Sequence, residues 1–215
     1  WLDESVGGWR FRSPAVRGAV LDFARGTLDW FGLHTAAAEA LAADGAPPVR
    51  IGEVMLSGGS LRAGLREVLR DLDRIREHES RETALSVVRD AQEPLESATL
   101  LPEEDLHGAL WRHEVDLLRE LGRTGECVDL ALRVLDSCQD LGWRRTGGQV
   151  ALALASVHAR DEDEALRWIE QALRLLDHPP DRARALERKG ALLTSRGALG
   201  EAEAVWRDAV RALAQ

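Results

Sequence analysis

Apolar residues recur at helical spacing through most of the chain. From position 61 onward they fall three or four residues apart, as in Leu61, Leu65, Val68, Leu69 and Leu72, which predicts one buried face per helix. Breaks in this pattern are expected at Glu79-Ser80, Glu93-Pro94, Leu101-Pro102, Gly122–Gly125, Gly142–Gly148, Arg160-Asp161, His178-Pro179-Pro180 and Gly197–Gly200. The breaks divide this region into helices of about 12–16 residues joined by short turns, an arrangement typical of antiparallel hairpins.

The first 60 residues have a different pattern. Residues 9–13 alternate apolar and polar side chains, which predicts a short strand, and Ser13-Pro14 has the form of a helix start. Helices are then expected over Ala15–Phe31, His34–Ala43 and Val49–Leu56, ended by Gly32, by Asp44-Gly45 and by Ser57-Gly58-Gly59. We therefore predict two domains, residues 1–58 and residues 59–215.

An internal repeat supports the helical architecture. Its clearest copy contains Leu186, Gly190, Leu193, Gly197, Leu199, Ala202, Trp206 and Ala209, a spacing that matches the 34-residue tetratricopeptide frame. The equivalent small residues Cys127, Ala165 and Ala202 lie 38 and 37 residues apart, so the copies are degenerate. The predicted fold is all-α, with antiparallel hairpins stacked as a tetratricopeptide-like right-handed superhelix.

Composition and charge exclude several classes of partner. The formal net charge of −9 is spread evenly over the chain, so no basic pole is available to bind nucleic acid or an anionic membrane. No apolar run approaches the roughly 18 residues that span a bilayer, and no secretory signal begins the sequence, so we expect a cytoplasmic protein. A single Lys against 27 Arg, with no Asn or Tyr, reflects a GC-rich gene, which makes the abundance of Arg weak evidence for phosphate recognition.

Motifs for catalysis and metal binding are incomplete. His113-Glu114 begins like a zinc-binding helix motif, but Leu117 stands where the second His is required. Glu103, Glu104 and His107, like the acidic run 161–164, fit the charge preference of a helix N-terminus. We therefore predict that the chain is not an enzyme and holds no cofactor or metal.

Cysteines and tryptophans are expected mainly in the core. Cys127 and Cys138, eleven residues apart on one helix, would lie about 16 Å apart along its axis, which is too far for a disulfide. Among the tryptophans, those expected to fill grooves between hairpins are Trp111, Trp168 and Trp206. Trp143, in a predicted turn beside Arg144-Arg145, is also a candidate exposed contact.

Two stretches carry a resemblance to a known family. Residues 9–20 (WRFRSPAVRGAV) resemble the end of the winged helix in LuxR-type large ATP-binding regulators, which are STAND-class, maltose-regulator-like proteins. Residues 33–50 are similar to the segment that follows in that family, before its degenerate tetratricopeptide hairpins. The resemblance implies a short winged-helix remnant at the N-terminus. Ser13 departs from the family, which usually has His there, and this puts nucleotide sensing by that position in doubt.

The resemblance also implies a function. The chain would be a non-catalytic sensor and interaction arm of a cytoplasmic ATP-dependent transcription regulator, contacting the parent's nucleotide-binding domain. ATP would bind only the parent, because this chain has no Gly-x4-Gly-Lys-Ser/Thr phosphate-binding loop. Since the sequence begins with Trp1 and not Met, we expect a fragment. The alternative is a free-standing tetratricopeptide adaptor for a peptide or protein partner.

The repeat frame also predicts a binding surface on the concave face, lined by the first helix of each hairpin. The frame places Arg112, Asp116, Arg119 and Glu120 there in one hairpin, Val150, Leu154, Val157 and His158 in the next, and Arg184 and Glu187 in the last. An apolar centre flanked by Arg suits a small amphipathic anion or an acidic peptide end. Alternatively, Arg112–Asp116 and Arg184–Glu187 are only intrahelical ion pairs.

Overall fold

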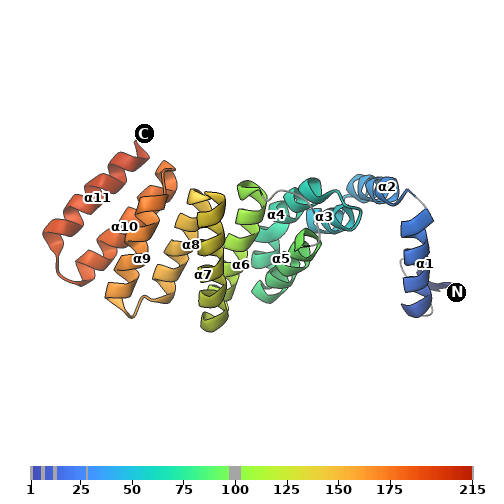
Figure 1. Ribbon diagram of the computed structural model, residues 1–215, viewed down its shortest axis with the longest axis horizontal. Coiled ribbons are helices and arrows are strands. Elements are labelled where there is room, and N and C mark those ends of the chain that lie inside the picture. The colour runs from blue at the N-terminus through green and yellow to red at the C-terminus, as the bar shows by residue number, and fades with distance from the viewer. Residues whose placement is uncertain (1, 6–7, 12–13, 28, 97–102, 215) are drawn as a thin grey trace. The chain divides into compact units, whose positions relative to one another are not determined.

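A computed structural model describes the chain except for residues 1, 6–7, 12–13, 28, 97–102 and 215. The described residues form eleven α-helices, one π-helical turn and one two-stranded hairpin, so the predicted all-α class is confirmed (Figure 1). The chain divides into two compact units, Trp1–Asp71 and Leu72–Gln215. This division falls within a helix, whereas the predicted boundary after residue 58 lies in the turn before it.

The first unit begins with an antiparallel hairpin. Strands β1 (Leu2–Ser5) and β2 (Gly8–Phe11) pair with Leu2 opposite Phe11. The expected strand is therefore present over residues 9–11, but its partner was not predicted. Positions 12 and 13, including the family departure at Ser13, lie outside the described residues.

Helices complete the first unit: α1 (Pro14–Thr27), α2 (Trp30–Ala43), α3 (Pro48–Ser57) and the beginning of α4 (Leu61–His78). The predicted helix Ala15–Phe31 is wrong, because Asp29 starts a new helix by accepting a hydrogen bond from the Gly32 backbone N–H at 2.9 Å. Gly32 therefore lies in the first turn of α2 and does not end a helix.

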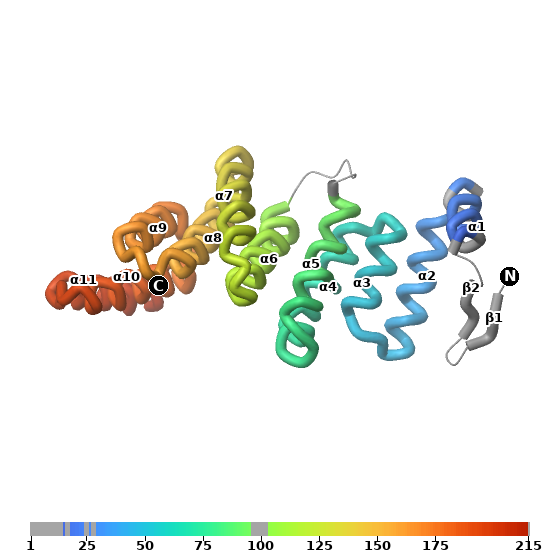
Figure 2. The backbone as a smooth tube through the Cα atoms, turned by 90° about the horizontal axis from the view of Figure 1, so that it is seen from below, coloured from blue at the N-terminus to red at the C-terminus, as the bar shows by residue number. Residues whose placement is uncertain are grey.

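The second unit is a run of antiparallel hairpins. After the end of α4 come α5 (Arg81–Glu96), the π-helical turn η1 (Glu104–Gly108), α6 (Ala109–Glu120), α7 (Thr124–Leu141), α8 (Arg144–Val157), α9 (Glu162–Leu175), α10 (Pro179–Ser195) and α11 (Leu199–Leu213). Each helix from α6 to α11 packs against the next (Figures 1 and 2). The hairpins are α6/α7, α8/α9 and α10/α11. The expected break at Glu93-Pro94 is wrong, because Pro94 lies in the last turn of α5 and little of the helix remains to be disrupted.

Small buried residues let the helices of each hairpin approach closely. Cys127, Ala165 and Ala202, the equivalent small positions of the repeat, are all buried. In the last hairpin, Gly190 of α10 leaves room for the ring of Trp206, since a Cβ there would lie 2.7 Å from that ring. The helical repeat is therefore present, and a large side chain at these positions would force the helices apart.

The glycine pair at positions 147 and 148 was expected in a turn, and this is wrong. Both residues lie inside α8, and a Cβ on Gly148 would come within 2.5 Å of Leu176 Cγ. A Cβ on Gly147 would meet its nearest neighbour, Cys138 Cβ, at an ordinary 3.4 Å. Gly148 is thus required by close packing, whereas Gly147 is not.

Two tryptophans differ from expectation. Trp143 is only 8% exposed and lies 5.4 Å from Trp111, measured between ring centroids, so it is not an exposed contact. Trp206, expected in the core, is 40% exposed, because among the described residues no helix follows α11 to cover it. Trp111 and Trp168 are partly buried, as expected.

The two glycines of α8 provide a matched test of packing. We expect Gly148→Ala to lower the free energy of unfolding by about 1–3 kcal/mol, because Leu176 is fully buried and cannot move aside. Gly147→Ala should raise it by up to about 1 kcal/mol through helix propensity. Urea denaturation followed by circular dichroism measures both, and equal effects of the two substitutions would contradict this packing.

Candidate functional site

The candidate site is a cavity of about 220 Å³ lined by the first helices of three successive hairpins. We call it the first-helix pocket. Its lining residues are Arg112, Asp116 and Arg119 from α6, Gln149, Leu152 and Ala153 from α8, and Asp181, Arg184 and Arg188 from α10. The residues from α6 and from α10 lie three or four positions apart, as do Gln149 and Ala153 of α8, so one side of each helix contributes.

Both acidic side chains of the pocket are already engaged. Asp116 lies 3.8 Å from Arg112 and 3.4 Å from Arg119. Asp181 accepts a hydrogen bond from Arg145 Nε at 2.8 Å and lies 3.0 Å from His178 Nδ1. Although burial opposes it, the bond from Arg145 helps to hold the pKa of Asp181 below its usual value. Neither carboxylate is therefore available to neutralise the remaining arginines.

Arg184 and Arg188 have no carboxylate within ion-pairing distance among the residues that the structure describes. Arg188 Nη1 donates to the carbonyl oxygen of Leu152 at 2.7 Å and also contacts Ser156 Oγ, both neutral acceptors. Burial, and then the charge of Arg119, lower the pKa of Arg188. Burying several positive charges close together is unfavourable in free energy, and an anion entering the pocket would offset that unfavourable term.

A buried donor in the same pocket lacks a partner. Arg119 Nε is inaccessible to solvent and makes no hydrogen bond in the described part of the chain. Four guanidinium groups thus line a cavity with two carboxylates, a local positive excess in a protein of net charge −9. The arrangement suits binding of an anion, because guanidinium pairs well with carboxylate or phosphate.

Of the ten residues that the repeat frame places on the binding surface, the structure brings four together: Arg112, Asp116, Arg119 and Arg184. Glu187 and His158 do not line the pocket, and Glu120 instead accepts hydrogen bonds from Arg76 and Arg81. Of the two intrahelical pairs that were the alternative explanation, Arg112–Asp116 is present, whereas Arg184 forms none with Glu187.

The prediction that Leu154 lines the surface is wrong, since Leu154 is 0% exposed, as is Val150. The cause is the turn between α8 and α9, residues 158–161, which is one residue longer than the turn 121–123 between α6 and α7. Counting back from Ala165 through a turn of fixed length therefore shifts the register of α8 by one residue. The equivalent positions are Gln149 and Ala153, which do line the pocket.

Sequence reasoning also missed Arg188 and Asp181. Arg188 lies four residues after Arg184 and therefore on the same face of α10, so helical spacing alone could have identified it. Asp181 precedes the repeat frame, and nothing in the pattern indicates its contacts with Arg145 and His178.

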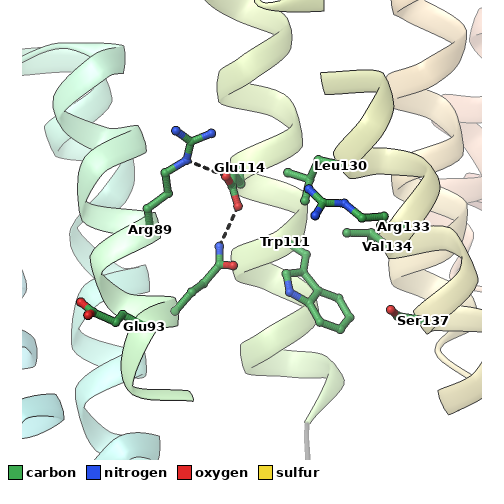
Figure 3. A pocket seen from close by; sticks show the side chains of 9 residues that line it. Arg89, Glu93, Trp111, Glu114, Leu130, Arg133, Val134 and Ser137 are labelled. Atoms are coloured by element: carbon green, nitrogen blue, oxygen red, sulfur yellow. Dashed lines mark hydrogen bonds and ion pairs between the residues drawn. The ribbon is translucent and has the colours of Figure 1, made fainter. Parts of the chain in front are cut away.

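A second cavity of about 400 Å³ lies between α5 and α7 over α6. We call it the outer groove. Figure 3 shows its main polar cluster, in which Glu114, only 7% exposed, accepts hydrogen bonds from Arg89 Nε at 2.8 Å and from Gln92 Nε2 at 2.9 Å. The bond to Glu114 raises the pKa of Arg89. Because each carboxylate oxygen already accepts a hydrogen bond, we interpret Glu114 as a structural residue that holds α5 and α6 together.

The described residues contain no group of three or more side chains suited to a metal ion. His107 Nδ1 accepts from the Glu103 backbone N–H at 3.0 Å, and Glu104 accepts from the Thr146 backbone N–H at 2.8 Å, so this cluster joins backbone segments. No helix in the described part of the chain is long and apolar enough to cross a membrane.

Both cysteines are free and buried, as expected. Burial raises the pKa of each thiol to about 11. Cys127 Sγ donates to the carbonyl oxygen of Val115 at 3.4 Å. A protonated, inaccessible thiol is a poor nucleophile, so these residues serve packing.

Comparison with known proteins supports the fold alone. No model of a protein family matches the sequence, and no curated protein does. The crystal structure of BtubC (BKLC) from P. vanneervenii is similar with a TM-score of 0.53 and 16% sequence identity, over 86% of this chain and 88% of that chain. The helical architecture is therefore shared with a known protein.

Glu114 allows a test of the outer groove. We expect Glu114→Ala to reduce the free energy of unfolding by about 1–3 kcal/mol, because it leaves Arg89 and Gln92 without their shared acceptor. The control is Glu126→Ala, since Glu126 also contacts Arg89 but is exposed. This substitution should lower the free energy of unfolding by a smaller amount. Equal losses in chemical denaturation would contradict a structural role for Glu114.

His113, next to the first-helix pocket, predicts a pH dependence. Burial and the neighbouring Arg112 lower its pKa from 6.5 to about 4. The unfolded chain therefore binds the extra proton first, and stability should fall as pH decreases from 6.5 to 4. His113→Gln should flatten this slope, because it lowers the difference in bound protons between the unfolded and folded states by up to one. Urea denaturation across this pH range measures the slope, and an unchanged slope in His113→Gln would refute the assignment.

Proposed function

We propose that this chain is a non-catalytic binding arm of helical repeats that takes an anionic ligand in the first-helix pocket. One observation carries the proposal: four arginines share the cavity with two carboxylates, and both carboxylates already have partners. Arg184 and Arg188 supply the charge that the ligand would neutralise. Carboxylate and phosphate groups fit best because guanidinium can donate two parallel hydrogen bonds to them.

The location of the pocket supports a role as a sensor. Its walls come from α6, α8 and α10, so a ligand would contact three hairpins at once. Such a ligand favours whichever arrangement of hairpins brings its contacts together, and its differential affinity would shift the population of states. A binding arm can in this way transmit occupancy to a neighbouring domain.

The parent protein that we propose is a cytoplasmic ATP-dependent transcription regulator of the LuxR type. This rests on the resemblance of residues 9–20 and 33–50 and on the helical repeat that follows. A tetratricopeptide-like right-handed superhelix and a winged-helix remnant belong to this proposal. Determining the flanking gene sequence tests it: a phosphate-binding loop upstream and a helix-turn-helix downstream are expected.

A free-standing adaptor for a protein partner is a second candidate. It is favoured by the apolar face of α11, where Leu199, Val210 and Leu213 are exposed. Exposed apolar patches often mark protein contacts. A complete gene without nucleotide-binding and DNA-binding regions would favour the adaptor over the regulator.

The double substitution Arg112→Ala with Arg184→Ala tests the binding site. We expect it to weaken binding of anionic probes (succinate, citrate and inorganic phosphate) at least tenfold in calorimetric titrations. The melting temperature should change little, because Arg184 has no ion pair within the described residues and Asp116, which loses its 3.8 Å contact with Arg112, keeps its contact with Arg119.

The matched control is Arg133→Ala with Arg174→Ala, two exposed arginines outside the pocket. This control should bind as the unmodified protein does. Full binding of every probe by the Arg112/Arg184 variant would refute the pocket as the anion site.

A further inference from the structure

The first-helix pocket shares Arg188 with another cavity, which lies between α8, α9 and α10. We call this cavity, which has a volume of about 510 Å³, the apolar pocket. It is lined by Ala155, Ser156, Ala159, Ala165, Ile169, Arg188, Ala191, Leu192 and Ser195. Ala165 and Ile169 come from α9. The other residues come later along α8, the turn after it and α10 than those of the first-helix pocket, and only Arg188 lines both.

The two pockets lie end to end. Helices α8 and α10 are the first helices of consecutive hairpins and run in the same direction (Figure 1). Along α8 and the turn after it, the first-helix pocket uses positions 149–153 and the apolar pocket uses 155–159, and along α10 they use 181–188 and 188–195. One elongated ligand could therefore occupy both.

Arg188 marks the junction of the two pockets. Its Nη1 is held by the carbonyl oxygen of Leu152 and by Ser156 Oγ, which fixes the guanidinium where the charged cavity meets the apolar one. Arg184 lies one helical turn earlier, toward the charged end. An acidic head group placed between these two arginines would direct the rest of the ligand toward the apolar pocket.

The apolar pocket suits a hydrocarbon chain better than a peptide. Four of its lining residues are alanines, and Ile169 and Leu192 line it as well, with Ala155 and Ile169 belonging to the hydrophobic core beneath it. Its two hydroxyls are engaged, since Ser156 Oγ donates to the Leu152 carbonyl at 3.1 Å and Ser195 Oγ donates to the Leu192 carbonyl at 2.7 Å. A peptide would bring backbone amides into a site that offers them few partners, which is costly.

We infer that the groove between α8 and α10 binds an unbranched amphipathic carboxylate, with its head group at Arg184 and Arg188 and its hydrocarbon chain in the apolar pocket. The inference rests on the proposed function and names its ligand class. Seven residues separate Arg188 from Ser195, a rise of about 10 Å along α10. This length corresponds to a chain of about eight carbons.

A chain-length series tests the inference. Acetate, butanoate, hexanoate, octanoate and decanoate are titrated into the protein by calorimetry, below the concentrations at which they form micelles. Each added methylene should tighten binding about twofold up to octanoate, because the open groove buries only part of each group, with little further gain for decanoate. Octanol, which lacks the charge, should bind at least tenfold more weakly than octanoate.

Two variants test where the hydrocarbon chain and the carboxylate of the ligand bind. Ala191→Trp fills the apolar pocket from an exposed position of α10 and should abolish the gain with chain length while leaving acetate binding intact. Its control is Ala204→Trp, on an exposed position of α11 outside both pockets. Arg184→Gln should weaken every carboxylate, whereas Arg133→Gln should weaken none.

The outcomes separate this inference from the proposed function. Equal affinity for acetate and octanoate, both reduced by Arg184→Gln, would overturn the acyl ligand and leave the anion site standing. Octanoate binding that neither Ala191→Trp nor Arg184→Gln alters would also overturn the inference. If octanoate does not bind but an acidic peptide does, and Ala191→Trp weakens the binding of that peptide, the ligand class would be peptides and not acyl carboxylates. Failure of every carboxylate and of phosphate to bind would refute the proposed function itself.

Discussion

Close contact between helices at small residues is the constraint on which the second unit depends. Cys127, Ala165 and Ala202 are buried where the two helices of each hairpin meet, and Gly148 leaves no room for a Cβ beside Leu176. Because these contacts fix the rotation of each helix about its own axis, they also decide which face of α6, α8 and α10 lies free of the core. The first-helix pocket is lined by charged and polar residues of those faces, together with Leu152 at the edge of the core.

The charge of the pocket depends on the same packing. Arginines from α6 and α10 would repel one another and separate if the helices could rotate independently. Hydrophobic burial along the hairpins outweighs this repulsion, so Arg119 and Arg188 stay close together, and burial followed by the charge of Arg119 lowers the pKa of Arg188. The net charge of −9 therefore gives no indication of the local positive site, and only the three-dimensional arrangement reveals it.

The sequence predicts the helices well because their buried stripes and turn residues are local signals. The hairpin α10/α11 follows its repeat pattern closely, and Arg112, Asp116, Arg119 and Arg184 lie where helical spacing places them. Contacts between distant residues leave no comparable signal. The close approach at Gly148 and the saturation of Glu114 depend on partners in other helices, so neither could be predicted.

The longer turn between α8 and α9 bears on how this chain should be compared with its homologues. Each helix carries its own apolar stripe, so an exposed turn can gain or lose a residue without disturbing the packing on either side. With an insertion there, a fixed-length repeat alignment compares pocket residues of one protein with core residues of another, as it does here between Ala153 and Leu154. Residues of the first-helix pocket should instead be matched between proteins through the buried contacts of each first helix, which keep their spatial positions when the numbering drifts.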